Sequence, residues 1–252
     1  MARIAVDIET RDEGRIARVT LENAAKANCL TSELVTELGN VFRRLAGDAD
    51  LRVAILTGEG PRSFMAGANL QELRHFDENS ARTYITALTA TNRAIRDLPV
   101  PVVARINGAC MGAGLEVAVS CDIRIAGDNA RFAMPEVLFD LPSVVEAALL
   151  PRLIGWGRTC WFLYRGDAID AATALQWGMV EKAVPAGELD AAVAETVDRF
   201  MANGPVGMRQ QKKLMRAWEH LPLEDGILAG IDSLSAAFRD GTPGARMAKF
   251  LD

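Results

Sequence analysis

The spacing of apolar and polar positions predicts strands and helices that alternate through the first half of the chain. Short apolar or alternating runs predict strands over four segments: residues 4–10, 16–21, 52–57 and 63–66. A helix is predicted between the second and third strands, because one face carries an apolar series, namely Leu34, Leu38, Val41, Phe42 and Leu45. Thr31 is suited to cap its start. The pattern predicts an α/β fold.

Two small-residue turns interrupt this pattern, each where a strand gives way to a helix. The apolar run over residues 100–110 predicts a buried strand that ends in the Gly-Ala-Gly turn at 112–114. The second turn, at 66–68, follows the strand at 63–66 and precedes a helix that begins near Asn69. Backbone N–H groups at a helix start lack partners within the helix and can bind an external oxygen atom. Both turns are therefore candidate binding positions.

The second half of the chain is predicted to be mostly helical. Asp170 is a suitable N-cap and Gly178 a suitable stop for one short helix, after which residues 180–184 form an extended segment. The remaining sequence predicts amphipathic helices without a catalytic constellation. Helices that cannot bury their apolar faces on their own domain commonly bury them on a neighbouring subunit. We therefore predict a core over residues 1–188 and a helical oligomerisation region over 189–252.

Composition and charge narrow the class of protein. The 252 residues, 50% of them hydrophobic, suffice for one large domain with a small appendage. The formal net charge of -5 argues against general nucleic-acid binding. A short basic cluster is interpreted as the solvated face of one helix: Arg209, Lys212, Lys213 and Arg216. The N-terminal residues lack a signal-peptide core, and no apolar run reaches membrane-spanning length. We expect a soluble, cytoplasmic protein that binds neither nucleic acid nor membrane.

The cysteines and histidines supply little material for metal or nucleophile chemistry. Four cysteines are too far apart for a zinc knuckle or a Cys-x-x-Cys redox pair, and their apolar contexts predict buried thiols: Cys29, Cys110, Cys121 and Cys160. The chain has only two histidines, which leaves almost nothing for a Ser-His-Asp triad or a multi-histidine metal site. We expect no metal.

Glu116 and Glu136 are the strongest candidates for chemistry. Each follows an apolar segment, where a carboxylate is costly unless it has a task. Glu116 comes directly after the Gly-Ala-Gly turn, and Glu136 follows a short predicted strand and Pro135. Two such carboxyl groups act as an acid/base pair when their surroundings leave a proton on only one of them.

Five segments carry a further pattern, in order along the chain: NAAKANCL at 23–30, SFMAGANL at 63–70, NGACMGAGLE at 107–116, CDIRIA at 121–126 and FAMPE at 132–136. Together they resemble the crotonase superfamily, the enoyl-CoA hydratase/isomerase family, and the likeness extends over nearly the whole chain. The resemblance implies a crotonase-like spiral of ββα units. It also implies that the C-terminal helices support homotrimers or dimers of trimers.

The resemblance implies roles for individual residues. The backbone N–H groups of Ala68 and Ala113 would form an oxyanion hole for the thioester carbonyl of an acyl-CoA. Glu116 would activate the water that attacks the β-carbon, and Glu136 would protonate the α-carbon. Substrate and CoA contacts would come from the loops near the first turn, namely Lys26, Ala27, Ala66, Gly67, Asn69 and Leu70. No separate cofactor is implied, because coenzyme A is part of the substrate.

These implications predict an enzyme, an enoyl-CoA hydratase or dehydratase that acts on a 2-enoyl-CoA thioester. Relatives that only move a double bond often keep just the second glutamate, so the presence of both favours hydration. Two alternatives stay open at this point. One is an enoyl-CoA isomerase of the same family, and the other is a non-catalytic acyl-CoA-binding scaffold.

Two features outside these motifs are interpreted structurally. The segment 140–146 differs from the glycine-rich loop of many family members, and within it Ser143 and Glu146 fit a capping box at a helix start. The spacing of three tryptophans is more typical of a core than of an acyl pocket: Trp156, Trp161 and Trp177.

Overall fold

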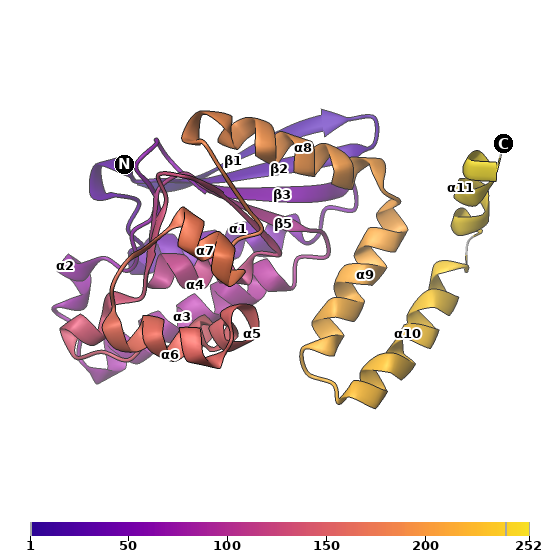
Figure 1. Ribbon diagram of the computed structural model, residues 1–252. Helices are drawn as coiled ribbons and strands as arrows, with labels where there is room; N and C mark the ends of the chain where they lie inside the picture. Colours follow the sequence, from indigo (N-terminus) through magenta and orange to yellow (C-terminus); the bar gives the residue numbers. More distant parts are fainter. Residues whose placement is uncertain (1, 240, 252) are drawn as a thin grey trace.

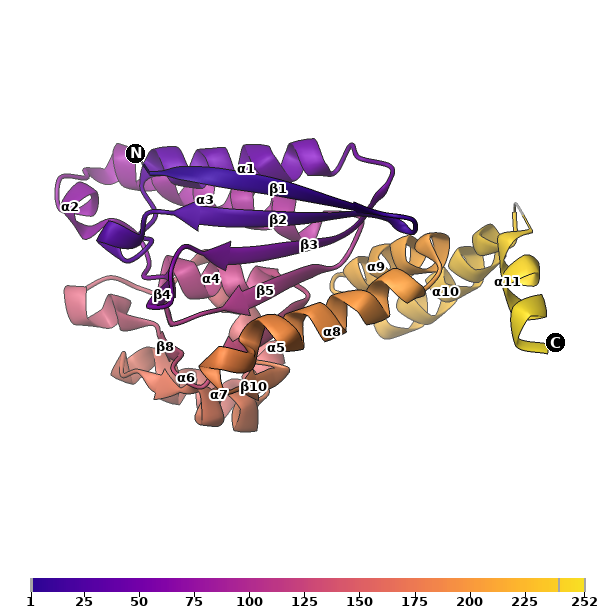
Figure 2. The ribbon, with the colours of Figure 1, turned by 90° about the horizontal axis from the view of Figure 1, so that it is seen from above.

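The computed structural model describes residues 2–239 and 241–251, with side chains at all of these positions except 242, 249 and 250. Two β-sheets form its centre (Figures 1 and 2). The larger sheet has the strand order β1 (Arg3–Arg11), β2 (Gly14–Glu22), β3 (Leu51–Gly58), β5 (Val102–Ile106), β7 (Ile123–Gly127) and β10 (Lys182–Val184). The smaller sheet has the order β4 (Ser63–Met65), β6 (Ala109–Met111), β8 (Arg131–Ala133) and β9 (Ile169–Asp170).

Successive ββα units build both sheets at once. β3 and β4 are followed by α2 (Leu70–Leu73) and α3 (Glu78–Arg96), and β5 and β6 are followed by α4 (Ala113–Ser120). β7 and β8 lead to a series of helical segments: η2 (Pro135–Phe139), η3 (Val145–Leu149), α5 (Leu150–Ile154), α6 (Trp156–Arg165) and α7 (Ala171–Trp177). In each unit the first strand joins the larger sheet and the second joins the smaller one. The predicted α/β class and the repeated ββα unit are confirmed.

The parallel strands of the smaller sheet set the positions of the three turns that follow them. β4 pairs in parallel with β6, and β6 pairs in parallel with β8. The carboxyl ends of parallel neighbours lie at one edge of a sheet, and the chain leaves this edge at Ala66, Gly112 and Met134. The two small-residue turns and the segment that carries Glu136 are therefore neighbours, although they are far apart in the sequence.

The apolar run over residues 100–110 forms two strands instead of the single strand predicted. β5 lies in the larger sheet and β6 in the smaller one, with Asn107 and Gly108 between them. A Cβ on Gly108 would collide with the carbonyl group of Arg62, so only glycine fits where the chain crosses between the sheets. The side-chain amide of Asn107 donates to the carbonyl of Ser63 at 3.0 Å and holds this crossing.

Helices cover both faces of the larger sheet. α1 (Ser32–Leu45), α3 and α4 contribute to the core on one face, where the predicted apolar series of α1 is buried. α8 (Leu189–Ala202) covers the other face (Figure 1), where Val193 and Val197 share a second core with Val53 and Ile55 of β3. The boundary near residue 189 stays a prediction, and α8 packs on the sheet that precedes it.

The last helices extend away from this body as an arm (Figures 1 and 2). The arm consists of α9 (Pro205–Trp218), α10 (Leu223–Ala237) and α11 (Thr242–Leu251). In the single chain α10 exposes a row of large apolar side chains, namely Leu223, Ile227, Leu228, Ile231 and Leu234. Across residues 2–239 and 241–251, no helix combines the length and the apolar character needed to cross a membrane.

α9 docks on the body through basic side chains that were predicted to face solvent. Lys212 is buried, and its Nζ donates to the carbonyl of Val100 at 3.2 Å and pairs with Asp122. Arg216 pairs with Asp97 at 2.8 Å. The predicted solvated face is therefore wrong for these residues. Carbonyl and carboxylate groups at the end of the sheet offer them partners that the local sequence does not reveal.

Candidate active site

Two turns at the edge of the smaller sheet come into contact. Gly67 and Gly112 have φ angles of 93° and 48°, a region that glycine adopts without steric cost. A Cβ on Gly67 would lie 3.0 Å from the carbonyl oxygen of Met111, and one on Gly114 would collide with the carbonyl of Met65. The small residues of both turns are therefore needed for this close approach.

Each turn leaves one backbone N–H group free. Leu30 N–H donates to the Gly67 carbonyl at 2.8 Å, and Asn69 N–H donates to the Leu30 carbonyl at 2.9 Å, which points the N–H of Ala68 away from this contact. Ala113 is the first residue of α4, so its N–H has no partner within the helix. Neither N–H donates to an acceptor among residues 2–239 and 241–251. Ala68 and Ala113 line the same cavity, so their N–H groups are candidate donors for an oxygen atom bound there.

The cavity has a volume of about 420 Å³, which is typical of a small-molecule site. Both predicted glutamates, Glu116 and Glu136, line it together with Tyr84. Most of the remaining wall is apolar and comes from α2, α3, the loop between them, η2 and the segment after η2, including Leu73, Phe76, Ile85, Leu88, Phe139 and Leu141. Of the described residues that line the cavity, none is Lys, Arg or His. The structure thus brings both glutamates and both turns to one largely apolar cavity.

Glu116 lies in the first turn of α4 and is only 4% exposed. Burial raises its pKa to about 8, and the charges of Glu136 and Glu146 act in the same direction. The backbone N–H groups of Ala147 and Val144 favour the ionised form and partly oppose this effect. Glu116 therefore holds a proton at neutral pH in the ligand-free protein.

Glu136 reaches the cavity from η2. Its Oε1 packs against the backbone of Gly112, where an added Cβ would lie 2.5 Å away. Its Oε2 accepts a hydrogen bond from Ser143 Oγ at 2.8 Å. Partial burial raises the pKa of Glu136, while its backbone N–H and Ser143 lower it. Because Glu136 is less deeply buried than Glu116, it is the member of the pair that ionises more readily.

The two carboxyl groups line one cavity. The negative charge of Glu136 adds to the effect of burial in raising the pKa of Glu116. Such a pair holds one proton over a range of pH and then presents an acid and a base to the same space. With two free N–H donors beside it, the site can bind a carbonyl oxygen, stabilise negative charge on that atom and move protons to and from its neighbours.

The capping box predicted from Ser143 and Glu146 is wrong. The residue before η3 is Val144, and no side chain caps this helix. Ser143 donates to Glu136 instead, and Glu146 turns inward, where its Oε2 accepts a hydrogen bond from Asn92 Nδ2 at 2.7 Å. A buried carboxylate needs strong donors, and those that it finds here lie on α3, far away in the sequence.

Four of the six residues predicted to contact the substrate belong to the first turn and the start of α2. Ala66 and Leu70 line the cavity. Gly67 lies behind its wall, against the second turn. Asn69 caps α2, because its side-chain oxygen accepts a hydrogen bond from the N–H of Gln71 at 3.0 Å. This cap agrees with the predicted helix start.

The other two, Lys26 and Ala27, lie outside the cavity wall. Lys26 is exposed at the end of η1 (Ala24–Lys26), and Ala27 follows it with a φ of 51°. The carbonyl of Ala27 accepts a hydrogen bond from the N–H of Ala66 at 3.2 Å. This loop therefore borders the first turn, and contact of Lys26 with a CoA nucleotide stays a prediction.

α3 supplies a cavity wall that the sequence motifs did not identify. Ala81, Tyr84, Ile85 and Leu88 line the cavity from this helix. Their spacing of three, four and seven positions is that of one helix face, and it is the signal by which they could have been found. The Tyr84 hydroxyl donates to the carbonyl of Leu30 at 3.3 Å, and burial raises the pKa of Tyr84, so its side chain is neutral.

The predicted core position is confirmed for one tryptophan and wrong for two. Trp177 packs edge to face against Phe162, with ring centroids 6.2 Å apart. Trp156 and Trp161 are 74% and 59% exposed on α6, and the guanidinium of Arg165 lies 4.6 Å from the Trp161 ring centroid. α6 contacts the body through the face that carries Phe162, which leaves these two rings outside.

The cysteine prediction holds for two of the four thiols. Cys110 and Cys121 are buried, whereas Cys29 and Cys160 are half-buried. In the part of the chain that the structure describes, no three His, Cys, Asp or Glu side chains are grouped so that they could hold a metal ion.

Comparisons with known proteins show which family this chain resembles along most of its length. The family model described as enoyl-CoA hydratase/isomerase matches residues 11–242. The short-chain-enoyl-CoA hydratase of Clostridium acetobutylicum is 30% identical over 241 residues, which cover 95% of this chain and 92% of that protein. The crotonyl-CoA hydratase of Syntrophomonas wolfei is 28% identical, over 95% of this chain and 93% of that protein.

A similar arrangement occurs among solved structures. The crystal structure of an enoyl-CoA hydratase from Bacillus anthracis superposes with a TM-score of 0.90 at 30% identity. The match covers 98% of this chain and 95% of that one. Because nearly the full length of both chains is aligned, the likeness includes the arm as well as the body.

Proposed function

The chain belongs to the enoyl-CoA hydratase/isomerase family, and from that premise we propose that it is an enzyme that adds water across the α,β double bond of a 2-enoyl-CoA thioester. The same site would catalyse the reverse dehydration. The crotonase-like fold predicted from the sequence is confirmed by the superposition. The observation that carries the proposal is the cavity that both glutamates and both free N–H groups line.

The proposed role of the two N–H groups follows from the charge that develops during hydration. Attack of water on the β-carbon pushes electron density onto the thioester oxygen. The free N–H groups of Ala68 and Ala113 would stabilise that oxygen, and loss of one such donor typically costs ~10²- to 10³-fold in rate. The donors need no side chain, so the alanines can serve as well as glycines.

The two glutamates divide the proton transfers. In the division that the resemblance implies, Glu116 takes a proton from the attacking water and Glu136 delivers one to the α-carbon. Deep burial keeps the proton on Glu116 in the ligand-free protein, so this division requires the proton to move to Glu136 when substrate and water enter. Hydrogen exchange at the α-carbon of a saturated acyl-CoA in D₂O tests it. Loss of exchange in Glu136→Gln alone supports this division, and loss in Glu116→Gln alone supports the reverse.

The cavity favours an apolar acyl chain. Its wall is mainly aliphatic and aromatic. Among the described residues that line it, the acidic groups are Glu116 and Glu136 and none is basic, so the negative charge that the pair shares would repel an acyl chain that ends in a carboxylate. We therefore expect crotonyl-CoA and hexenoyl-CoA to be hydrated faster than glutaconyl-CoA, whose chain carries such a group.

A mass-resolved screen of enoyl-CoA thioesters tests the proposed function. A product that has gained one water supports hydration. A product of unchanged mass with a shifted double bond would identify an isomerase instead, and binding without turnover across the panel would identify a scaffold. Both glutamates line the cavity, which is the observation that favours hydration over isomerisation.

The arm supplies the basis for the proposed assembly. The apolar row on α10 remains exposed in the single chain, and the same row on a second copy is a matching apolar surface against which it can pack. A homotrimer or a dimer of trimers is the assembly we propose. Residence in the cytoplasm stays a prediction from the sequence.

A further inference from the structure

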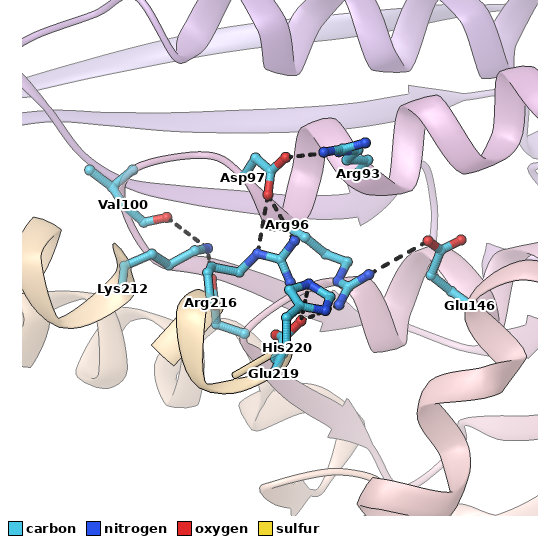
Figure 3. Close-up of polar contacts among 10 residues, drawn as sticks. Arg93, Arg96, Asp97, Val100, Glu146, Lys212, Arg216, Glu219 and His220 are labelled. Atoms are coloured by element: carbon cyan, nitrogen blue, oxygen red, sulfur yellow. Dashed lines mark hydrogen bonds and ion pairs between the residues drawn. The ribbon is translucent and has the colours of Figure 1, made fainter. Parts of the chain in front are cut away.

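A third buried carboxylate lies behind the cavity wall. Glu146 is 7% exposed, and it does not belong to the residues that line the cavity. Asn92 Nδ2 donates to it at 2.7 Å, and Arg96 Nη1 lies 3.8 Å from its Oε1, as the dashed line in Figure 3 shows. A buried charge of this kind is expensive where an apolar side chain could pack, which calls for a role.

Glu146 is attached to the stretch of backbone that faces Glu116. Val144 lines the cavity, and the backbone N–H groups of Val144 and Ala147 act on the Glu116 carboxyl. Val145 between them has a φ of 39°, a strained conformation for a β-branched residue that persists only where its surroundings hold it. The bond from Asn92 fixes the neighbouring side chain to α3, so Glu146 anchors this strained turn against the helix.

The positive charge near Glu146 is shared with other carboxylates. Arg96 pairs with Glu219 at the end of α9, and Glu219 also pairs with Arg216, which in turn contacts Asp97 (Figure 3). Because Arg96 is closer to Glu219 than to Glu146, the charge of Glu146 is only partly neutralised. Figure 3 shows the pairs as one cluster that extends from the turn before α5 to the arm.

The groups that face Glu116 come from three elements. They are Glu136 of η2, Glu146 of η3 and Tyr84 of α3. Tyr84 is neutral, so the charges that bear on Glu116 are those of the two glutamates. Only Glu136 belongs to the proposed proton transfers. Burial raises the pKa of Glu146 above its ordinary value, whereas the hydrogen bond from Asn92 and the charge of Arg96 favour its ionised form, which places a negative charge beside the pair.

We propose that Glu146 is a positioning residue for hydration: it anchors the turn at 144–147 against Glu116 and holds a negative charge behind it, which biases where the single proton of the Glu116–Glu136 pair resides. This inference rests on the proposed function, because it names a further residue of the same site. It also connects the arm to that site, since Glu219 competes for the cation that would otherwise neutralise Glu146.

The test compares loss of the charge with change of its geometry. Glu146→Gln keeps the shape and removes the charge, so ionisation of Glu116 becomes easier. The limb of the kcat/KM pH profile that belongs to Glu116 should move to lower pH by about one unit. Glu146→Asp keeps the charge, so the same limb of its kcat/KM pH profile should stay near that of the wild type even if kcat falls. An unmoved limb in Glu146→Gln, or an equal shift in Glu146→Asp, would overturn the proposal.

Two further variants control the experiment. Glu219→Gln removes the carboxylate that competes with Glu146 for Arg96, so Arg96 can pair fully with Glu146. The limb of the kcat/KM pH profile should therefore move to lower pH in this variant, by less than in Glu146→Gln. This variant keeps the proposal testable if Glu146→Gln does not fold, and an unmoved limb there would then count against it. Asp97→Asn removes the same unit charge at the outer end of the cluster, where it should leave the limb in place.

A second readout separates this inference from the proposed function. Infrared titration of the Glu116 carboxyl, assigned by its loss in Glu116→Gln, follows the proton without any turnover. A lower midpoint in Glu146→Gln supports the positioning role even if the screen finds no hydration. An unchanged midpoint contradicts it even if hydration is found.

Discussion

The body of the molecule and the arm bury their apolar residues to very different degrees. In the body, Leu38 of α1 is fully buried under the larger sheet. In the arm, Leu234 of α10 is 66% exposed, and its apolar neighbours on the helix are exposed as well. The body also buries two carboxylates, Glu116 and Glu146, and partly buries a third, Glu136, which is a cost that folding alone does not explain.

The cavity and the exposed apolar row thus lie in different parts of the single chain. Of the residues that the structure describes, those that line the cavity all fall within 66–144, in the body. The arm contributes instead a surface to be buried and, through Glu219, a charge two contacts away from Glu146. The body of one chain therefore brings both glutamates and both turns to one cavity, whereas the apolar row of its arm is exposed in the single chain.

The largest effect is expected from a matched pair of substitutions, one in the body and one on the arm. Leu38→Ala should lower the free energy of unfolding by about 2–5 kcal/mol, because it leaves a cavity in a packed core. Leu234→Ala should change it by less than about 0.5 kcal/mol in a dilute, dissociated sample, because the side chain is already in water there. Chemical denaturation of both variants at low protein concentration measures the two values.

A similar cost at both positions would contradict the division, since it would mean that a single chain already buries α10. The same pair also reports on assembly. At high concentration, sedimentation should show that Leu234→Ala weakens self-association, whereas Leu38→Ala leaves the association of the folded chain unchanged.

Local sequence signals predicted the elements whose chemistry is local. Thr31 and Asp170 cap their helices as predicted, with bonds from the N–H groups of Leu34 at 3.2 Å and Thr173 at 2.8 Å. The turns and the two glutamates were also found from the sequence. The turns and Glu116 are marked by small residues before a helix, and Glu136 by a short strand followed by Pro135. The parallel strands of the smaller sheet then bring these segments together.

The sequence did not reveal roles that depend on a partner from a distant element. The sequence pattern predicted that Glu146 caps a helix. In the structure Glu146 accepts a hydrogen bond from Asn92 on α3, which is distant in the sequence. Lys212 looked solvated because Asp122 and the carbonyl of Val100 reach it only when α9 is docked. In each case the local sequence pattern fitted a simpler role. In the structure the side chain is buried and bonds to a residue of another element instead.

A smaller effect is expected from the burial of Glu116 in the body, because it makes the free energy of unfolding depend on pH. The pKa of this group is about 8 in the folded protein, against 4.5 for an ordinary glutamate, so the folded state binds a proton that the unfolded chain releases. The stabilising contribution is complete below pH 4.5 and is lost as the pH rises through 8. The free energy of unfolding of the wild type should therefore fall relative to Glu116→Gln, by at most about 1.4 kcal/mol per pH unit.

Thermal unfolding of both proteins from pH 5 to pH 9 measures this difference, in which the other titrating groups cancel. Parallel curves would show that Glu116 ionises in the folded protein as it does in the unfolded chain. Glu195→Gln serves as a control, because Glu195 is an exposed carboxylate paired with Lys182 and should not produce this slope.

The most direct test of the central claim, that two carboxyl groups act as a unit on one cavity, is the rate of enoyl-CoA hydration in Glu116→Gln, Glu136→Gln and the double variant. Each single substitution should lower kcat/KM by ~10²- to 10⁴-fold while the thermal unfolding temperature shows that the protein stays folded. The double variant should lose little more than the worse single variant, because groups that act together are not additive. Losses that multiply, or a single variant with nearly wild-type turnover, would contradict the account.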